Sequence, residues 1–498
     1  MATSAEIYRN FIGGEWVGAT GGDAFESRSP ANGDLIGTFV RSTVEDADRA
    51  VAVAKEAYAS WRLVPAPKRG EILFRFGALV AEHKDELSEL MSREMGKVLA
   101  EAGGDVQEAI DMSYYMAGEG RRLFGHTTPS ELPDKFNMSV RQPIGVVGVI
   151  TPWNFPIAIP SWKIVPALVC GNTVVFKPAT DTPMLAHRFV ELLSEAGVPP
   201  GVVNLVHGSG RDVGDRLVRH PDVPVVTLTG SRETGVDVLK AAADNLKHVH
   251  LELGGKNGII VMDDADLDLA VEGIVWSAFG TSGQRCTAAS RVIVHRAVYD
   301  ELRSRLVSEV EKLRLGSGWE ADTDVGPVIN ASALGKIHAY TEIGKSEGAV
   351  LLTGGEVATE NGLDRGYYYR PTIFGDVEAG MRIAQEEIFG PTTALIPVDD
   401  FEEAIRVANG IRYGLSSSIF TADVNRAFRA MRDLEAGITY INAGTIGAEV
   451  HLPFGGTKET GNGHREAGQA ALDVFTEWKS IYVDYSGKLQ RAQIDTEP

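Results

Sequence analysis

The sequence is poor in cysteine and has fewer basic than acidic residues. Its 498 residues include only Cys170 and Cys286, which argues against a disulfide framework and is typical of a reducing compartment. Lys and Arg number 48 against 68 Asp and Glu, so the formal net charge is −20. A surface of this sign repels phosphate backbones and anionic lipid, and we expect neither nucleic acid nor a membrane as a partner.

Long apolar runs are also missing. The most apolar window, residues 143–170, is interrupted by four prolines and Lys163, which favours buried strands and turns over a membrane helix. The first residues show no basic segment followed by an apolar one, so no secretory signal is predicted. We therefore expect a cytoplasmic protein of two to four domains, at ~100–200 residues per domain.

Apolar periodicity divides the chain into two α/β series. After an amphipathic helical region at 44–116, short buried strands are predicted at 146–150, 173–176, 202–206, 225–229 and 249–253, with helices such as 184–196 and 234–245 between them. This alternation predicts a parallel sheet flanked by helices, as in nucleotide-binding layers. A second series has strands at 258–262, 291–295 and 393–398 and helices at 299–313 and 401–409. The polar, β-patterned segments 136–142 and 476–485 fit neither series, and could pair as an arm that extends to another subunit.

Cys286 lies in the small-residue loop Gly-Thr-Ser-Gly-Gln-Arg-Cys-Thr, after the helical run 269–278. An exposed thiol beside Arg285 would have a lowered pKa and would be a nucleophile. The alternative is a buried, inert cysteine, which is the commoner case and the one that Cys170 fits.

Two polar residues interrupt apolar or proline-rich surroundings. Glu252 stands in Leu-Glu-Leu-Gly-Gly-Lys-Asn, where burial would raise its pKa as a general base for water requires, although pairing with Lys256 is an alternative. Asn154 stands in Thr-Pro-Trp-Asn-Phe-Pro, where its amide could serve an oxyanion or merely form a turn.

A cofactor segment is less obvious. Gly208, Gly210 and Gly214 follow a predicted strand, but their spacing is not the dinucleotide fingerprint. A better candidate is the segment 228–235, in which a strand leads into a helix N-terminus that could meet a pyrophosphate. Lys177, at the end of strand 173–176, could reach a ribose, although a lysine there is often just a strand end.

Seven segments together resemble the aldehyde dehydrogenase superfamily. They are residues 151–156, 177–180, 228–235, 252–257, 283–287, 386–391 and 453–456, and the resemblance covers residues 7–485. It implies an α/β fold with a Rossmann-type cofactor domain at 1–123 and 144–254, an α/β catalytic domain at 255–452, and a β-arm for oligomerisation at 124–143 and 467–498. A homodimer or homotetramer follows from such an arm.

The resemblance also implies roles for individual residues. Cys286 would be the nucleophile, Asn154 with the Cys286 N–H the oxyanion hole, Glu252 the base for the deacylating water, and Glu466 a proton relay. Because relatives that transfer the acyl group to coenzyme A typically lack this glutamate, Glu252 favours hydrolysis to the acid. The coenzyme would contact Trp153, Lys177, Thr180, Gly230, Ser231, Gly235, Glu387 and Phe389, and the substrate would contact Phe155, Trp162, Thr287 and Phe454. No metal is implied.

The loop at 444–449 resembles the substrate loop of the antiquitin-type branch, which oxidises α-aminoadipate semialdehyde. There an arginine and loop N–H groups hold a distal carboxylate, and here Arg285, Gly447 and Ala448 match, while Glu108 matches the residue that meets the amino group. A guanidinium suits a carboxylate, so we expect a carboxylate-bearing semialdehyde; α-ketoglutarate or succinate semialdehyde would fit equally. The alternatives are a salt bridge at Arg285 that only shapes the loop, and a general aliphatic or aromatic aldehyde as substrate.

Thr180 stands where many NAD-selective relatives carry glutamate. Without that carboxylate a 2′-phosphate is not repelled, which predicts that NADP is accepted beside NAD and leaves the preference open. A thiol hydrolase would share Cys286 and a base but would have no use for Lys177, Ser231 or Glu387. A retired dehydrogenase with a structural role would have lost Cys286 or Glu252.

Overall fold

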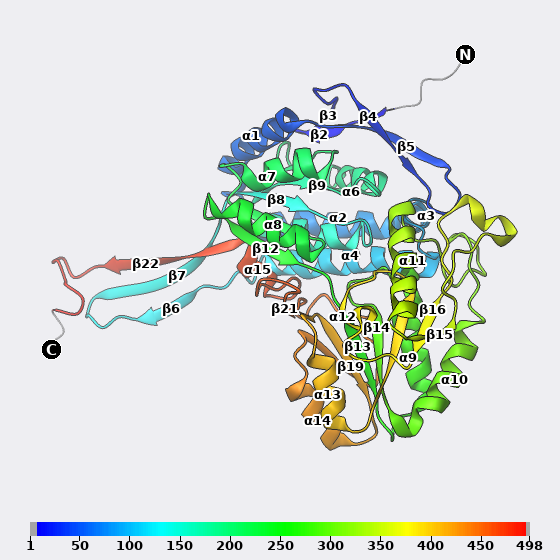
Figure 1. Ribbon diagram of the computed structural model, residues 1–498. Coiled ribbons are helices and arrows are strands. Elements are labelled where there is room, and N and C mark those ends of the chain that lie inside the picture. Colours follow the sequence, from blue (N-terminus) through cyan, green and yellow to red (C-terminus); the bar gives the residue numbers. More distant parts are fainter. Residues whose placement is uncertain (1–6, 495–498) are drawn as a thin grey trace, which may run out of the picture.

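The structure is a computed structural model that describes residues 7–494. Its described part contains two seven-stranded sheets, each flanked by helices, and a three-stranded arm that projects from the body (Figure 1). The outer parts of two expected domain ranges, residues 1–6 and 495–498, lie outside the described residues. No helix within 7–494 combines the length and apolar character needed to cross a bilayer.

The first sheet has the strand order β12-β11-β8-β9-β10-β2-β3. The chain runs from β8 outward through β9 and β10, then returns to place β11 and β12 on the other side of β8. All four pairings among these five strands are parallel, so the order reverses between β8 and β11, where open α/β sheets bind ligands. The strands are β2 (Asn10–Ile12), β3 (Glu15–Val17), β8 (Val146–Ile150), β9 (Thr173–Lys177), β10 (Val203–Leu205), β11 (Val225–Thr229) and β12 (His248–Glu252).

Helices cover both faces of this sheet, so its strands are apolar on both sides, as the continuous valine-rich runs predicted. One apolar cluster joins the sheet to α1, α7 and α8, and a second joins it to α2, α3, α4, α5 and α6. The helices are α1 (Val44–Trp61), α2 (Ala66–Glu82), α3 (Lys84–Met95), α4 (Leu99–Glu119), α5 (Ala158–Cys170), α6 (Pro183–Glu195), α7 (Asp215–Arg219) and α8 (Arg232–Ala243).

Helix α5 corrects the expectation of strands and turns throughout residues 143–170. Pro160 is tolerated because it lies in the first turn, where backbone N–H groups have no helical acceptor. Pro166 lies inside the helix and removes a hydrogen bond. Every residue of α5 except Ile159 is buried, and this packing outweighs a local proline penalty of ~3 kcal/mol.

The second sheet has the order β15-β16-β17-β14-β13-β19-β20, and only β15 is antiparallel to its neighbour. The predicted strands near 258–262, 291–295 and 393–398 are confirmed as β13, β14 and β17, and helix 401–409 is confirmed as α13. The strands are β13 (Asn257–Val261), β14 (Ala289–His295), β15 (Val350–Thr353), β16 (Thr372–Gly375), β17 (Thr392–Val398), β19 (Ser416–Phe420) and β20 (Ile438–Ile441). The helices are α9 (Leu267–Phe279), α10 (Tyr299–Val310), α11 (Ala331–Ser346), α12 (Arg382–Gln385), α13 (Phe401–Asn409) and α14 (Val424–Asp433).

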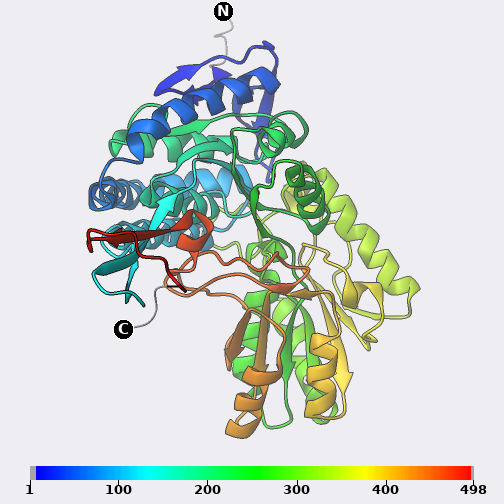
Figure 2. The same ribbon diagram turned by 90° about the vertical axis from the view of Figure 1, so that its left-hand side faces the viewer.

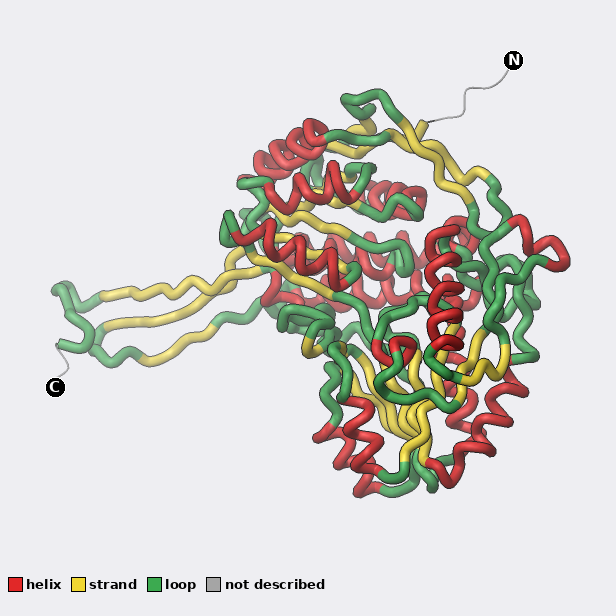
Figure 3. The backbone as a smooth tube through the Cα atoms, viewed as in Figure 1, coloured by secondary structure: helices red, strands yellow, loops and turns green. Residues whose placement is uncertain are grey.

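The arm consists of β6 (His126–Pro129), β7 (Lys135–Pro143) and β22 (Thr476–Asp484), in the order β22-β7-β6. The predicted pairing of segments 136–142 and 476–485 is confirmed: β7 and β22 are antiparallel, from Thr476 opposite Pro143 to Asp484 opposite Lys135. Figure 3 shows the arm extending away from both sheets. Phe136, Trp478, Tyr482 and Val483 are exposed on it, an apolar surface that a monomer leaves in water.

Two small sheets complete the fold. The first, at the N-terminal end, has the order β1-β5-β4 with β1 (Ile7–Tyr8), β4 (Ala24–Arg28) and β5 (Leu35–Val40). The second pairs β18 (Tyr413–Gly414) with β21 (Thr457–Lys458). After β21 the chain crosses back to the first sheet and forms α15 (Ala471–Val474) before it enters the arm (Figure 2). This crossing brings residues near 466 against the ends of β11 and β12.

Candidate active site

The loop before Cys286 is conformationally strained. Thr281, Ser282 and Gly283 are consecutive residues in the left-handed region, with φ of 53°, 55° and 67°. A Cβ on Gly283 would lie 2.1 Å from the Gly390 carbonyl oxygen, so only glycine fits there. Strain of this kind persists where surrounding contacts hold it, and it is concentrated at functional sites.

Several hydrogen bonds hold this loop in place. The Thr281 N–H donates to both carboxylate oxygens of Glu101, at 3.0 and 2.8 Å. Asn154 Nδ2 donates to the Gln284 carbonyl at 3.0 Å, and Asn257 Nδ2 donates to the Cys286 carbonyl at 2.7 Å. Asn257 was not predicted to act here. Asn154 therefore lies against the nucleophile loop. Its side-chain amide has a second hydrogen that is not used in the bond to the Gln284 carbonyl.

A cavity of about 70 Å³ opens beside Cys286. It brings together residues from segments more than 350 positions apart. Three of the predicted catalytic residues line this cavity, namely Cys286, Glu252 and Glu466. All the predicted substrate contacts line it as well: Glu108, Phe155, Trp162, Arg285, Thr287, Gly447, Ala448 and Phe454.

The cavity also has lining residues that the sequence reasoning missed: Ala158, Ile159, Thr229, Leu253, Leu415 and Ile446. Phe155, Ile159 and Trp162 are spaced by four and three residues. Helical periodicity would therefore have indicated Ile159 if α5 had been recognised. Leu415 and Ile446 carry no comparable sequence signal.

The expected lowering of the Cys286 pKa by Arg285 is wrong. Burial, followed by the nearby carboxylates of Glu252, Glu387 and Glu466, raises the pKa of the Cys286 thiol to about 12. The Arg285 side chain turns to Thr281, whose Oγ1 accepts from Nε at 2.9 Å, and to Glu101, which lies 3.3 Å from Nη2. Cys170 is buried, and burial raises its pKa to about 12 as well.

Glu252 ends strand β12 and is 3% exposed. Burial first, and then the neighbouring Glu466 carboxylate, raise the pKa of Glu252 well above its usual range. The alternative pairing with Lys256 is wrong, because the amine of Lys256 and both carboxylate oxygens of Glu252 lack hydrogen-bond partners within residues 7–494. The Glu252 carboxylate is therefore buried, held by no hydrogen bond, and open to the cavity.

A buried polar cluster adjoins Glu252. The amine of Lys163 on α5 forms an ion pair with Glu466 and donates to Thr227 Oγ1 at 3.0 Å. His250 lies between the two carboxylates, with Nε2 3.5 Å from Glu252 Oε1 and Nδ1 3.6 Å from Glu466 Oε1. Lys163, Thr227 and His250 were not predicted as site residues. They become recognisable only when α5, β11 and β12 are packed together.

The lining of the cavity also includes Arg285 and Glu108, which interact electrostatically. Arg285 is 12% exposed there, and no protein acceptor is bound to its Nη1 within the described chain. Burial, followed by the charge of Asp105, raises the pKa of Glu108 to about 8. Gly447, which lines the same cavity, has a φ of 102°. Arg285 thus forms the expected loop-shaping salt bridge and also presents a guanidinium edge to the cavity.

The residues predicted to contact the adenine side of the coenzyme suit a dinucleotide. Lys177 ends β9 and is 6% exposed, its amine makes no hydrogen bond within residues 7–494, and burial lowers its pKa to about 8. Thr180 is exposed nearby, and Ser231 caps α8 by accepting from the Thr234 N–H at 3.2 Å. A buried amine without a partner and a helix N-terminus at the carboxyl edge of the sheet fit phosphate and ribose groups.

The predicted nicotinamide-side residues lie next to the nucleophile loop. Glu387 Oε1 accepts from the Gly255 N–H at 2.9 Å, and a Cβ on Gly255 would lie 2.6 Å from the Cys286 carbonyl oxygen. The rings of Trp153 and Phe389 meet edge to face, with centroids 5.6 Å apart. A Cβ on Gly230 would make only ordinary contact with Leu228, at 3.7 Å, whereas Gly235 packs tightly against Leu253.

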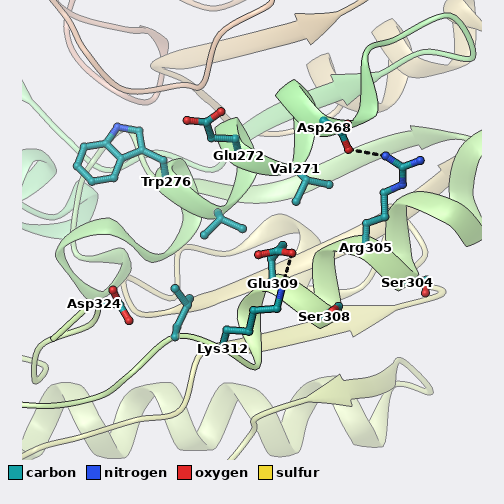
Figure 4. A pocket seen from close by; sticks show the side chains of 12 residues that line it. Asp268, Val271, Glu272, Trp276, Ser304, Arg305, Ser308, Glu309, Lys312 and Asp324 are labelled. Carbon is teal, nitrogen blue, oxygen red and sulfur yellow. Dashed lines mark hydrogen bonds and ion pairs between the residues drawn. The ribbon is translucent and has the colours of Figure 1, made fainter. Parts of the chain in front are cut away.

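A larger groove of about 930 Å³ lies elsewhere, between α9 and α10. Figure 4 shows two ion pairs among its charged side chains, Asp268 with Arg305 and Glu309 with Lys312. Its lining contains no cysteine, histidine or buried carboxylate. The chemistry therefore belongs to the smaller cavity beside Cys286.

Known proteins match this arrangement over nearly the whole chain. A family model described as the aldehyde dehydrogenase family matches residues 16–481. The chain is 44% identical to the α-ketoglutaric semialdehyde dehydrogenase of Bacillus subtilis, covering 97% of this chain and 99% of the relative. It is 42% identical to the α-ketoglutarate semialdehyde dehydrogenase of Haloferax volcanii, covering 96% and 99%.

A solved structure supports the same assignment. The betaine aldehyde dehydrogenase of Staphylococcus aureus in complex with NAD+ superposes with a TM-score of 0.95 at 36% identity, covering 98% of this chain and 96% of that one. The strained cysteine loop, the buried Glu252 and the two-sheet fold thus occur in a chain that family model, relatives and structure all match. The chain belongs to the aldehyde dehydrogenase family and is an oxidoreductase that acts on aldehydes.

Proposed function

We propose that this enzyme oxidises a semialdehyde with a distal carboxylate, of the α-ketoglutarate semialdehyde class, to the dicarboxylic acid. The carrying observation is that Cys286, Glu252 and Arg285 line one and the same cavity. The names of the two relatives above point to the same substrate class. NAD(P) is the proposed electron acceptor.

Cys286 is the proposed nucleophile. Its proton leaves to solvent, and the thiolate Sγ adds to the aldehyde carbon, which gives a thiohemiacetal with charge on the former carbonyl oxygen. Asn154 Nδ2 and the Cys286 N–H are the proposed donors to that oxygen, a contribution of ~3–4 kcal/mol per donor in transition-state stabilisation. Bound NAD(P) supplies the hydride acceptor, and loss of hydride leaves a thioester on Sγ.

Glu252 is the proposed base for hydrolysis of that thioester. It takes a proton from water as the oxygen attacks the acyl carbon, and collapse of the adduct releases the acid and the Cys286 thiolate. A buried carboxylate with a raised pKa is a stronger base than an exposed one. Glu466, ion-paired with Lys163, is proposed to pass the proton onward from Glu252.

Recognition of the substrate carboxylate is assigned to Arg285, with the N–H groups of Gly447 and Ala448. Glu108 lines the same cavity, and its raised pKa of about 8 favours a neutral carboxyl group near pH 7. A neutral carboxyl donates a hydrogen bond, which suits a keto oxygen; an ammonium would require the ionised form.

The coenzyme is proposed to lie along Lys177, Thr180, Gly230 and Ser231, with Glu387, Phe389 and Trp153 at the nicotinamide end. NADP is proposed to be accepted beside NAD, because Thr180 presents no negative charge to a 2′-phosphate. Gly235 contributes through the packing of α8 on Leu253, so a direct contact with coenzyme is not proposed for it.

The larger organisation follows the same proposal. We infer a cofactor domain at 1–123 and 144–254, a catalytic domain at 255–452 and an oligomerisation arm at 124–143 and 467–498. The exposed aromatic residues on β7 and β22 support a homodimer or homotetramer. The two free cysteines support a reducing compartment such as the cytoplasm.

The decisive experiment measures NADH or NADPH absorbance with α-ketoglutarate semialdehyde, succinate semialdehyde and butanal. The proposal requires a higher kcat/KM for the two carboxylate-bearing aldehydes. Cys286→Ala should abolish coenzyme reduction, and Cys170→Ala is the matched control that should retain it. Equal kcat/KM for all three aldehydes would contradict the substrate class, and a thiol hydrolase would give no reduced coenzyme at all.

A further inference from the structure

We propose that His250 is a positioning residue that donates a hydrogen bond from Nε2 to Glu252 and keeps this carboxylate ionised in its buried site. This inference rests on the proposed role of Glu252 as the base. It concerns a side chain that the reaction described above does not use.

The placement of His250 follows from strand geometry. His250 and Glu252 are two residues apart on β12, so their side chains lie on the same face of the sheet. The imidazole is 2% exposed, and its Nε2 lies 3.5 Å from Glu252 Oε1. Its other nitrogen, Nδ1, faces Thr227 and Glu466. The ring therefore presents one nitrogen to the proposed base.

The contacts of Thr227 fit a His250 ring that carries its hydrogen on Nε2. Thr227 is the direct cross-strand partner of His250 on β11. Its Oγ1 accepts a hydrogen bond from Lys163 Nζ at 3.0 Å and lies 2.9 Å from His250 Nδ1. The hydroxyl hydrogen of Thr227 is available for Nδ1, and the proposal assigns Nδ1 as its acceptor. A neutral imidazole with an accepting Nδ1 has its hydrogen on Nε2.

The ring is neutral because its surroundings disfavour a positive charge. Burial is the main cause, and Lys163, His464 and Arg465 act in the same direction to hold the pKa of His250 well below its usual range. A neutral His250 donates from Nε2 without adding a charge to the site.

The atoms that would form this bond are otherwise unsatisfied. His250 Nε2 and both carboxylate oxygens of Glu252 are buried and have no hydrogen-bond partner in the described chain. Buried polar atoms in folded proteins are nearly always paired. A shift of about half an ångström in the Glu252 side chain brings the 3.5 Å separation to an ordinary N–H···O length. The same side chain also borders the cavity.

A donor at this position matters because Glu252 must be ionised to act as a base. Burial and Glu466 both favour the protonated acid, whereas an N–H directed at the carboxylate favours the anion. The titratable and charged groups that face Glu252 or His250 are Cys286, Glu466, Lys163, His464 and Arg465. Among the groups around Glu252, His250 is the neutral donor.

The experiment isolates the hydrolytic step with p-nitrophenyl acetate. The ester transfers its acetyl group to Cys286 Sγ and releases p-nitrophenolate as a burst, and steady turnover then reports hydrolysis of the acyl enzyme. Both phases are followed at the isosbestic wavelength of nitrophenol from pH 5.5 to 9. Glu252→Gln is measured first: it should keep the burst and lose the steady turnover, and retained turnover would remove the base assignment itself.

His250→Leu should keep the burst and move the acid limb of steady turnover upward by about one pH unit. His250→Gln keeps an N–H at nearly the same reach and should restore the wild-type limb. Thr227→Val removes the hydroxyl group that donates to Nδ1, so an intact His250 is no longer held in the tautomer with its hydrogen on Nε2. The acid limb of steady turnover should move in the same direction as in His250→Leu. His248→Leu, on the exposed end of the same strand, should leave the profile unchanged.

An unmoved acid limb in both His250→Leu and Thr227→Val would overturn the proposal, and so would uniform slowing at every pH. The thermal unfolding transition of each variant shows whether that variant is folded. If His250→Leu does not fold, Thr227→Val against Thr227→Ser decides the outcome, because serine keeps the hydroxyl hydrogen.

Discussion

Replacement of Arg285 by alanine is the sharpest test of substrate recognition. In the structure Nε is bound to Thr281, Nη2 lies 3.3 Å from Glu101, and Nη1 remains available at the cavity. A hydrogen bond between charged groups contributes ~1.5–3 kcal/mol. Its loss should lower kcat/KM for a carboxylate-bearing aldehyde by about 10- to 150-fold.

The same replacement also leaves Glu101 buried without its counter-charge, although Thr281 still donates to it. We therefore expect a loss of stability that has nothing to do with substrate. The double variant R285A/E101Q removes both charges and should recover that stability, and E101Q alone reports how far loop shape matters. R285K keeps the charge but loses the planar pair of donors, so its effect should be intermediate.

The assay compares succinate semialdehyde with butanal, which has the same chain length and no carboxylate. Arg285→Ala should lower the ratio of their kcat/KM values, and the ratio should stay low in R285A/E101Q while thermal stability returns. A ratio that is the same in wild type and R285A/E101Q would refute the assignment of Arg285 to the substrate. Arg285 would then act only by shaping the loop.

Three further predictions concern the coenzyme, the fold and the nucleophile. Thr180→Glu should lower the ratio of kcat/KM with NADP to kcat/KM with NAD by about tenfold or more, because the new carboxylate repels the 2′-phosphate. An unchanged ratio in steady-state assays would show that residue 180 does not lie near the 2′ position of the coenzyme. Asp105 and Lys97 form an ion pair whose two side chains are 0% exposed. Asp105→Ala leaves the Lys97 ammonium without this partner, so the free energy of unfolding, measured in urea, should fall by about 3–5 kcal/mol. Asp222→Ala breaks an exposed ion pair with Lys55 and should lower the same free energy by about 1 kcal/mol or less. Because the pKa of Cys286 is raised to about 12, the reactive thiolate is the minor form at neutral pH. The rate of alkylation by iodoacetamide, measured by mass spectrometry, should therefore rise about tenfold per pH unit from pH 7 to 9.5. A rate that reaches a plateau below pH 8 would contradict the raised pKa.

Much of the fold could be predicted because its signals are local. Buried parallel strands are continuous apolar runs, and β8 and β11 begin and end where that pattern does. The arm strands were recognisable because polar alternation in β7 and β22 suits neither core. Helix α5 was missed because prolines normally end helices, whereas here burial from neighbouring helices outweighs that local preference.

The candidate site divides in the same way. Cys286, Glu252 and Asn154 stand out because each is a reactive or polar residue in an improbable local setting. The pKa of Cys286 could not be predicted from its neighbour in sequence. Whether Arg285 acts on the thiol depends on where its side chain turns, and Glu101, 184 positions earlier in the chain, draws it away.

The two α/β layers and the arm could be read from the order of residues, since they depend on periodicity, while the reacting residues were proposed from the resemblance of seven segments to a known family. Only the tertiary structure decided how the buried charges are paired. Lys163, Thr227, His250 and Glu466 come from four different segments of the chain, and electrostatic interactions depend on distance and burial rather than on order along the chain.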